Sequence, residues 1–153
     1  MEKIVGSLVG VSYHTFDTVY DLLFTTEKLI AFIIEHPNDV PYRPTLKEFF
    51  LGGTMSKRTE QSERAKIAKS RRHNLQEKPI NELAAMHPLN FEIRYGEVTS
   101  VEIKHGPFQS QLRFDTSNRS TTRQKIRFTL SKEQIPDAQR LLELVLASKI
   151  KRK

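Results

Sequence analysis

Apolar residues recur at every second position through much of the second half of the chain. The segments that show this pattern are 91–95, 101–103, 112–114 and 126–130. Alternation with a period of two is typical of strands with one buried face and one solvated face. Residues 4–13 and 18–25 also read as strands, and residues 135–146 carry an apolar stripe at helical spacing. With residues 29–34, the pattern predicts a mainly β fold of seven strands, closed by a C-terminal helix.

Residues 29–34, LIAFII, are apolar on both faces. A strand with one face in water should alternate, so something must cover the outer side of this one. The most apolar piece available is a short helix predicted at 46–51. We expect it to cover its own sheet, and a homo-oligomer built through Phe49, Phe50 and Leu51 is the alternative.

A helical insertion separates the third predicted strand from the fourth. Residues 56–75 have helix-forming composition with few apolar positions, and residues 79–86 predict a second, short helix with Pro79 in its first turn. We therefore treat residues 1–153 as a single domain, with the insertion at 44–88 and a basic tail at 149–153.

Positive charge is concentrated in two places. The net charge is +7, of which residues 57–78 contribute +5 and residues 149–153 contribute +4, leaving −2 for the rest of the chain. Four of the basic residues are seven apart and would share one stripe of a helix, with a fifth beside it. The expected binding residues are Lys57, Arg64, Arg71, Arg72, Lys78, Lys151, Arg152 and Lys153.

Localised positive charge favours an anionic partner, either a phospholipid surface or an acidic protein. The insertion lacks the apolar face of an interfacial membrane helix, so it would adsorb electrostatically, at about 1 kcal/mol per basic residue. Nucleic acid is the weaker candidate, because residues 57–78 contain no aromatic side chain for base stacking. A structural role, in which the insertion mediates self-assembly, is the competing hypothesis.

Catalytic and metal-binding patterns are missing from the sequence. The five histidines are scattered without metal-ligand spacing, and there is no cysteine for thiolate chemistry or disulfides. We therefore expect a non-enzymatic protein that needs no cofactor or metal. No secretory leader is visible and no apolar run approaches the roughly 20 residues of a membrane helix. These features favour a cytoplasmic protein, with peripheral binding at the inner membrane face.

Two short segments resemble a known family. The segment LFTTEKLI at 23–30 is similar to the first hairpin of GRAM-like and other bacterial or archaeal pleckstrin-homology-like (PH-like) domains, and FEIRYGEVTSV at 91–101 is similar to a later strand pair. Arg94 stands where proline is usual, and Val98 where isoleucine is usual. The Asn-Phe-x-Ile-x-Tyr pattern at 90–95 resembles uncharacterised prokaryotic members with a helical insertion between the third and fourth strands.

The resemblance covers residues 4–34 and 90–146. It implies a seven-stranded bent-sheet barrel capped by a C-terminal helix. Members of the family mostly bind lipid headgroups or proteins, so the resemblance implies no enzymatic activity.

Overall fold

The structure is a computed structural model of the chain. It describes residues 2–13, 15–39, 54–117 and 125–151, and within these ranges the side chains of residues 15–17, 38 and 54–61 are not described. The predicted helix at 46–51, with Phe49, Phe50 and Leu51, lies outside the described residues.

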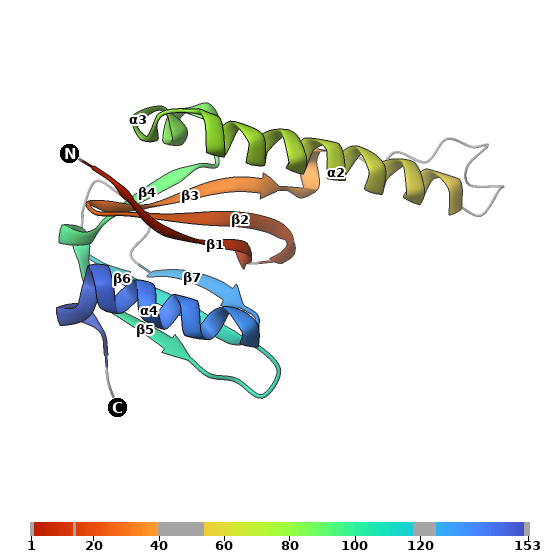
Figure 1. Cartoon of the computed structure of the whole chain (residues 1–153). Coiled ribbons are helices and arrows are strands. Elements are labelled where there is room, and N and C mark those ends of the chain that lie inside the picture. Colours follow the sequence, from red (N-terminus) through yellow and green to blue (C-terminus); the bar gives the residue numbers. More distant parts are fainter. Residues whose placement is uncertain (1, 14, 40–53, 118–124, 152–153) are drawn as a thin grey trace.

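Seven strands form one antiparallel sheet. The strands are β1 (Ile4–Tyr13), β2 (Thr15–Thr25), β3 (Lys28–Glu35), β4 (Phe91–Arg94), β5 (Val98–Lys104), β6 (Ser110–Thr116) and β7 (Lys125–Leu130). Their order across the sheet is β4-β3-β2-β1-β7-β6-β5. The sheet is strongly bent, so that β1 to β4 face β5 to β7 across the core (Figure 1). The predicted seven-stranded, mainly β architecture is confirmed.

Helices follow the third strand and close the chain. They are η1 (Pro37–Asp39), α2 (Thr54–Glu77), α3 (Ile80–Leu83), η2 (Ala84–Met86), η3 (Tyr95–Glu97), η4 (Lys132–Gln134), α4 (Ile135–Leu146) and η5 (Ala147–Lys149). Helix α2 extends past both ends of the predicted segment. The second predicted helix of the insertion is one turn of α-helix followed by a 3-10 turn.

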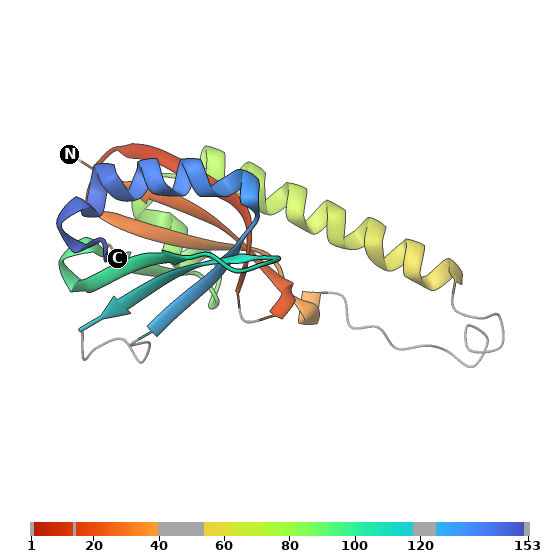
Figure 2. The same cartoon turned by 90° about the horizontal axis from the view of Figure 1, so that it is seen from below.

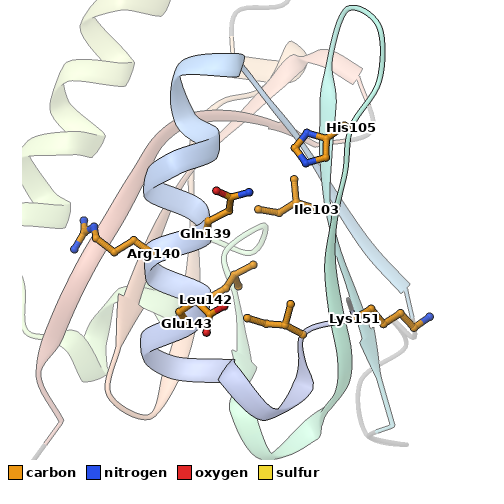
Figure 3. A pocket seen from close by; sticks show the side chains of 8 residues that line it. Ile103, His105, Gln139, Arg140, Leu142, Glu143 and Lys151 are labelled. Atoms are coloured by element: carbon orange, nitrogen blue, oxygen red, sulfur yellow. The ribbon is translucent and has the colours of Figure 1, made fainter. Parts of the chain in front are cut away.

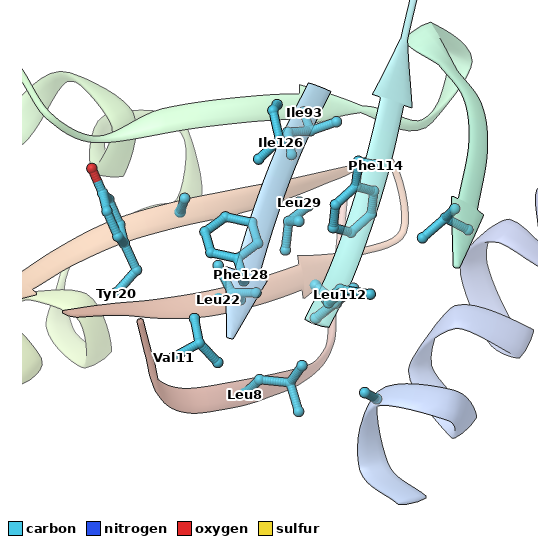
Figure 4. Close-up of a cluster of buried hydrophobic side chains, with 14 of the residues drawn as sticks. Leu8, Val11, Tyr20, Leu22, Leu29, Ile93, Leu112, Phe114, Ile126 and Phe128 are labelled. Atoms are coloured by element: carbon cyan, nitrogen blue, oxygen red, sulfur yellow. The ribbon is translucent and has the colours of Figure 1, made fainter. Parts of the chain in front are cut away.

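The main core lies between the two halves of the sheet. Alternate residues of the strands point inward and meet the apolar stripe of α4, as the period-two pattern predicted (Figure 4). Phe128 lies beside four other rings, those of Tyr13, Tyr20, Phe91 and Phe114, at centroid separations of 5.3 to 6.4 Å. The hydroxyl of Tyr20 donates to the carbonyl oxygen of Leu89 at 2.7 Å, which satisfies its polar end inside the core.

A second, smaller core covers the outer face of β3. There the side chains of Ile30, Phe32 and Ile34 are buried beneath Ala68 of α2 and Leu83 of α3. The prediction that this strand needs a cover is therefore confirmed, and the insertion of the same chain supplies it. Within the described residues the cover comes from α2 and α3, whereas the helix at 46–51, which was expected to supply it, lies outside them.

Helix α2 reaches beyond the body it covers. Its C-terminal half lies along β3, and its N-terminal half extends past the end of the sheet (Figures 1 and 2). Among the described residues, no helix has both the length and the apolar character needed to cross a bilayer.

Candidate functional site

Arg71 clamps α2 to the end of β3. Its guanidinium donates two hydrogen bonds to the carboxylate of Asp39, at 2.6 and 2.7 Å, and another to the carbonyl oxygen of Ile34 at 2.9 Å. The side chains of Arg71 and Asp39 are only 18% and 11% exposed. A two-pronged bond of this kind fixes the orientation of the guanidinium as well as its position. Arg71 therefore has a structural role, because it holds α2 against the end of β3.

The clamp lies within a small group of titratable side chains. Burial by itself would raise the pKa of Asp39, but hydrogen bonds from Arg71 and from the backbone N–H of His36, together with the charge of Arg71, hold that pKa below its ordinary value. The pKa of His87 is lowered, because burial and the positive charge of Arg71 disfavour its imidazolium form, against a smaller opposing effect of Asp39. Nδ1 of His87 accepts a hydrogen bond from the backbone N–H of Leu89 at 3.0 Å.

Arg72 makes the second clamp, farther along the sheet. It lies 3.1 Å from the carboxylate of Asp21, a β2 residue whose side chain is only 4% exposed. The same carboxylate accepts a hydrogen bond from the backbone N–H of Gly10 at 2.9 Å. Asp21 is therefore a buried charge with partners on two sides, as burial of a carboxylate requires.

The stripe chosen from the seven-residue spacing is mostly the inner face of α2. Arg71 belongs to it and is paired, and Arg64 is half-buried, while the side chain of Lys57 is not among those described. Ala68 and Leu75 are also seven apart, and both pack in the second core. That apolar pair is the sequence signal that marks the inner face.

The outer face of α2 carries a different set of cations. Lys66 and Lys69, three residues apart, are exposed, and so is Lys78 just beyond the helix. In the part of the chain that the structure describes, no ion pair or hydrogen bond engages Lys66 or Lys69. These two lysines, which are not among the binding residues expected from the seven-residue spacing, are available to a partner outside the molecule.

The basic tail is partly tied to the sheet. The ammonium group of Lys149 donates to the carbonyl oxygen of Tyr95, Ile150 bridges to Val101 of β5, and the backbone N–H of Lys151 donates to Val101 at 2.8 Å. The side chain of Lys151 lies 3.9 Å from Asp115 and is 59% exposed. Arg152 and Lys153 lie outside the described residues.

Asn90 is a structural residue that the sequence analysis did not single out for a role. Its side-chain oxygen accepts from the backbone N–H of Ile33 at 2.7 Å, and its amide nitrogen donates to the carbonyl oxygen of Leu83 at 2.9 Å. Asn90 thus adds one hydrogen bond to β3 directly before β4 begins, and it links α3 to the sheet through a second hydrogen bond. Its position directly before β4, in the pattern at 90–95, was the available signal.

A groove of about 510 Å³ lies between β5 and α4 (Figure 3). Apolar side chains lie beside charged and polar ones along it: Ile103, Leu142 and Ile150, with His105, Gln139, Arg140, Glu143 and Lys151. Cysteine, serine, threonine and tyrosine are absent from this lining, so the groove itself supplies no hydroxyl or thiol nucleophile. In the described part of the chain, no group of three or more His, Cys, Asp or Glu side chains is placed to hold a metal ion.

No protein-family model, curated protein or solved structure matches the chain significantly. Its function must therefore be inferred from its own geometry.

Proposed function

We propose that this chain is a non-enzymatic, PH-like binding module that associates peripherally with an anionic phospholipid surface through α2. The arrangement of seven antiparallel strands, a helical insertion after β3 and a closing helix supports the PH-like assignment. One observation carries the functional part: α2 is clamped through its inner face and presents Lys66 and Lys69 to solvent, without partners in the described structure. A cytoplasmic protein acting at the inner membrane face fits this proposal.

The clamps matter for binding because they fix where the free cations point. Arg71 and Arg72 neutralise Asp39 and Asp21, so α2 lies on the sheet without leaving those carboxylates to compete for the outer lysines. Each exposed basic residue held near an anionic leaflet contributes about 1 kcal/mol. Such contacts are screened over a distance of about 10 Å at 0.1 M salt, so binding should be moderate and sensitive to salt.

Two other partners are less well supported. Residues 57–78 lack aromatic side chains for stacking on bases, which disfavours nucleic acid. In the self-assembly alternative a second copy would bury the outer face of β3, whereas α2 and α3 of the same chain cover it.

Co-sedimentation with vesicles tests the proposal. The chain should sediment with phosphatidylglycerol-containing vesicles at low salt, release at high salt, and ignore vesicles of phosphatidylcholine alone. The double variant Lys66→Glu/Lys69→Glu should bind at least roughly tenfold more weakly, given about 1 kcal/mol per basic residue.

The matched control is Lys125→Glu/Arg127→Glu, which changes the net charge equally at two exposed positions of β7. It should retain most of the binding. Absence of sedimentation at low salt, or equal losses in the two double variants, would show that α2 is not a membrane-binding element. An acidic protein partner would then be the better hypothesis.

A further inference from the structure

The turn between β5 and β6 exposes an aromatic ring. Phe108 is 89% exposed, whereas the other exposed large hydrophobic residues in the described chain reach at most 61%. A phenylalanine ring normally contributes to folding by leaving water, so a ring that is almost fully exposed adds little to the stability of the fold.

The backbone of the turn that carries the ring is tightly folded. A Cβ atom on Gly106 would lie 2.4 Å from the carbonyl oxygen of Gln109, so a larger residue would force the turn open. Pro107, the next residue, restricts the backbone further by fixing its own φ. Phe108 is therefore presented by a constrained turn, which lowers the entropy cost of using it in a contact.

Basic residues lie beside the ring. Lys104, His105 and Arg113 line a hollow of about 430 Å³ beside Phe108, and the lining contains no carboxylate. Lys104 and His105 are exposed, and no ion pair engages either of them within the described residues. Arg113 is held in place by Gln111, at 2.8 and 3.0 Å, and lies 3.9 Å from Glu102.

The turn and the projecting half of α2 lie at the same end of the molecule. Both extend from the right-hand end of the sheet in Figure 1 and again in the rotated view of Figure 2. The turn and the projecting half of α2 therefore share an end of the molecule, whereas Lys66 and Lys69 lie in the half of α2 that runs along β3.

We propose that Phe108 inserts into the interfacial layer of an anionic phospholipid bilayer, while Lys104 and His105 face the lipid phosphates. This inference rests on the proposed function. A bilayer suits the geometry better than a protein does, because a single aromatic residue on a narrow turn offers far less than the roughly 800 Å² per partner of a stable protein interface. Aromatic rings at the bilayer interface are a recurrent means of anchoring.

The chain contains no tryptophan, so Phe108→Trp creates a single emission reporter at the turn. Its emission should shift to shorter wavelength and become protected from acrylamide when phosphatidylglycerol-containing vesicles are added. The matched control is Leu144→Trp on α4, at an apolar site that is also exposed (61%) and near the end of the helix away from the turn. Its emission should stay unchanged.

A second variant, Phe108→Ser, measures the contribution of the ring. Vesicle binding should weaken by roughly tenfold or more, the partition factor for burying a phenylalanine side chain, with unchanged thermal unfolding because the residue is exposed. If Phe108→Trp sediments with vesicles but its emission does not change, insertion is wrong and the proposed function stands. If the unmodified chain does not bind anionic vesicles at low salt, both are wrong. Full binding by Phe108→Ser would also overturn the inference.

Discussion

Arg71 and Asp39 form a two-pronged ion pair that joins the insertion to the end of β3, with N–O distances of 2.6 and 2.7 Å. Asp39 also accepts a hydrogen bond from the backbone N–H of His36 at 2.9 Å, so the pair orders the chain as it leaves the strand. The insertion is thus attached by a specific polar contact in addition to the apolar contacts of the second core.

Replacing Arg71 with alanine should destabilise the protein. The change leaves the poorly exposed carboxylate of Asp39 without its main donor, which costs about 1–3 kcal/mol for a buried group. Urea unfolding of Arg71→Ala, Asp39→Ala and the double variant would give the coupling energy. Arg71→Lys should recover only part of the loss, since lysine keeps the charge but not the paired donors. A coupling energy near zero would mean that the pair adds nothing to stability.

Stability should fall as the solution becomes acidic, in two steps. The folded-state pKa of His87 lies below the ordinary 6.5, so below about that pH the unfolded chain takes up a proton that the folded chain resists. The lowered pKa of Asp39 adds stability that is present above its ordinary 3.8 and is lost as the pH falls through the folded value.

The variant His87→Asn separates these steps. Asparagine can still accept the hydrogen bond from Leu89 but does not titrate, so the decline that begins near pH 6.5 should shrink while the decline at lower pH remains. Urea midpoints between pH 8 and about pH 2 provide the measurement. An unchanged slope around pH 6 would show that His87 is not responsible.

Gly10 should be intolerant of a side chain for a purely conformational reason. Its φ is +72°, and a Cβ atom there would meet nothing within 4 Å. Gly10→Ala should therefore cost about 1–2 kcal/mol through the left-handed backbone alone, and Gly10→Asn should cost less, because asparagine tolerates that region. Both keep the N–H that binds Asp21. Equal stability of all three proteins in urea would contradict the conformational explanation.

Leu83 should be essential to the second core. It is 1% exposed between α3 and the outer face of β3, so Leu83→Ala should cost about 2–5 kcal/mol. The control Leu144→Ala removes the same atoms from a site that is 61% exposed, where the change should stay within about 0.5 kcal/mol. Thermal unfolding compares the two, and similar losses would mean that the cover of β3 is not tightly packed.

The strands were predictable because the alternation of apolar and polar residues within each strand follows directly from its buried and solvated faces. The partners of the basic residues were not predictable. All four of Arg71, Arg72, Lys66 and Lys69 are basic residues of one helix, and their sequence neighbourhood does not show which of them are paired. The acidic partners of the two arginines, Asp39 and Asp21, lie more than thirty positions earlier in the chain. Charge on a helix indicates what it can bind, and only the three-dimensional structure shows which charges are already satisfied.

The exposed ring of Phe108 was hidden for a similar reason. Residues 105–107 predict a turn from their composition, but a turn residue can fold inward or outward with the same sequence. The structure shows that the ring points outward, and it places Gly106 close to the carbonyl oxygen of Gln109, a contact that the sequence does not reveal.

The bridge between Ile150 and Val101 has a consequence for association between copies of the chain. An open sheet has two edge strands, and an unpaired edge is a template for aggregation. At one edge β4 has only four residues, which limits what can pair with it. At the other edge β5 has seven, and the tail occupies its middle with a parallel bridge and the hydrogen bond from Lys151. Residues 150 and 151 therefore occupy hydrogen-bonding groups at the middle of β5, and a second molecule cannot use those groups to pair with this edge.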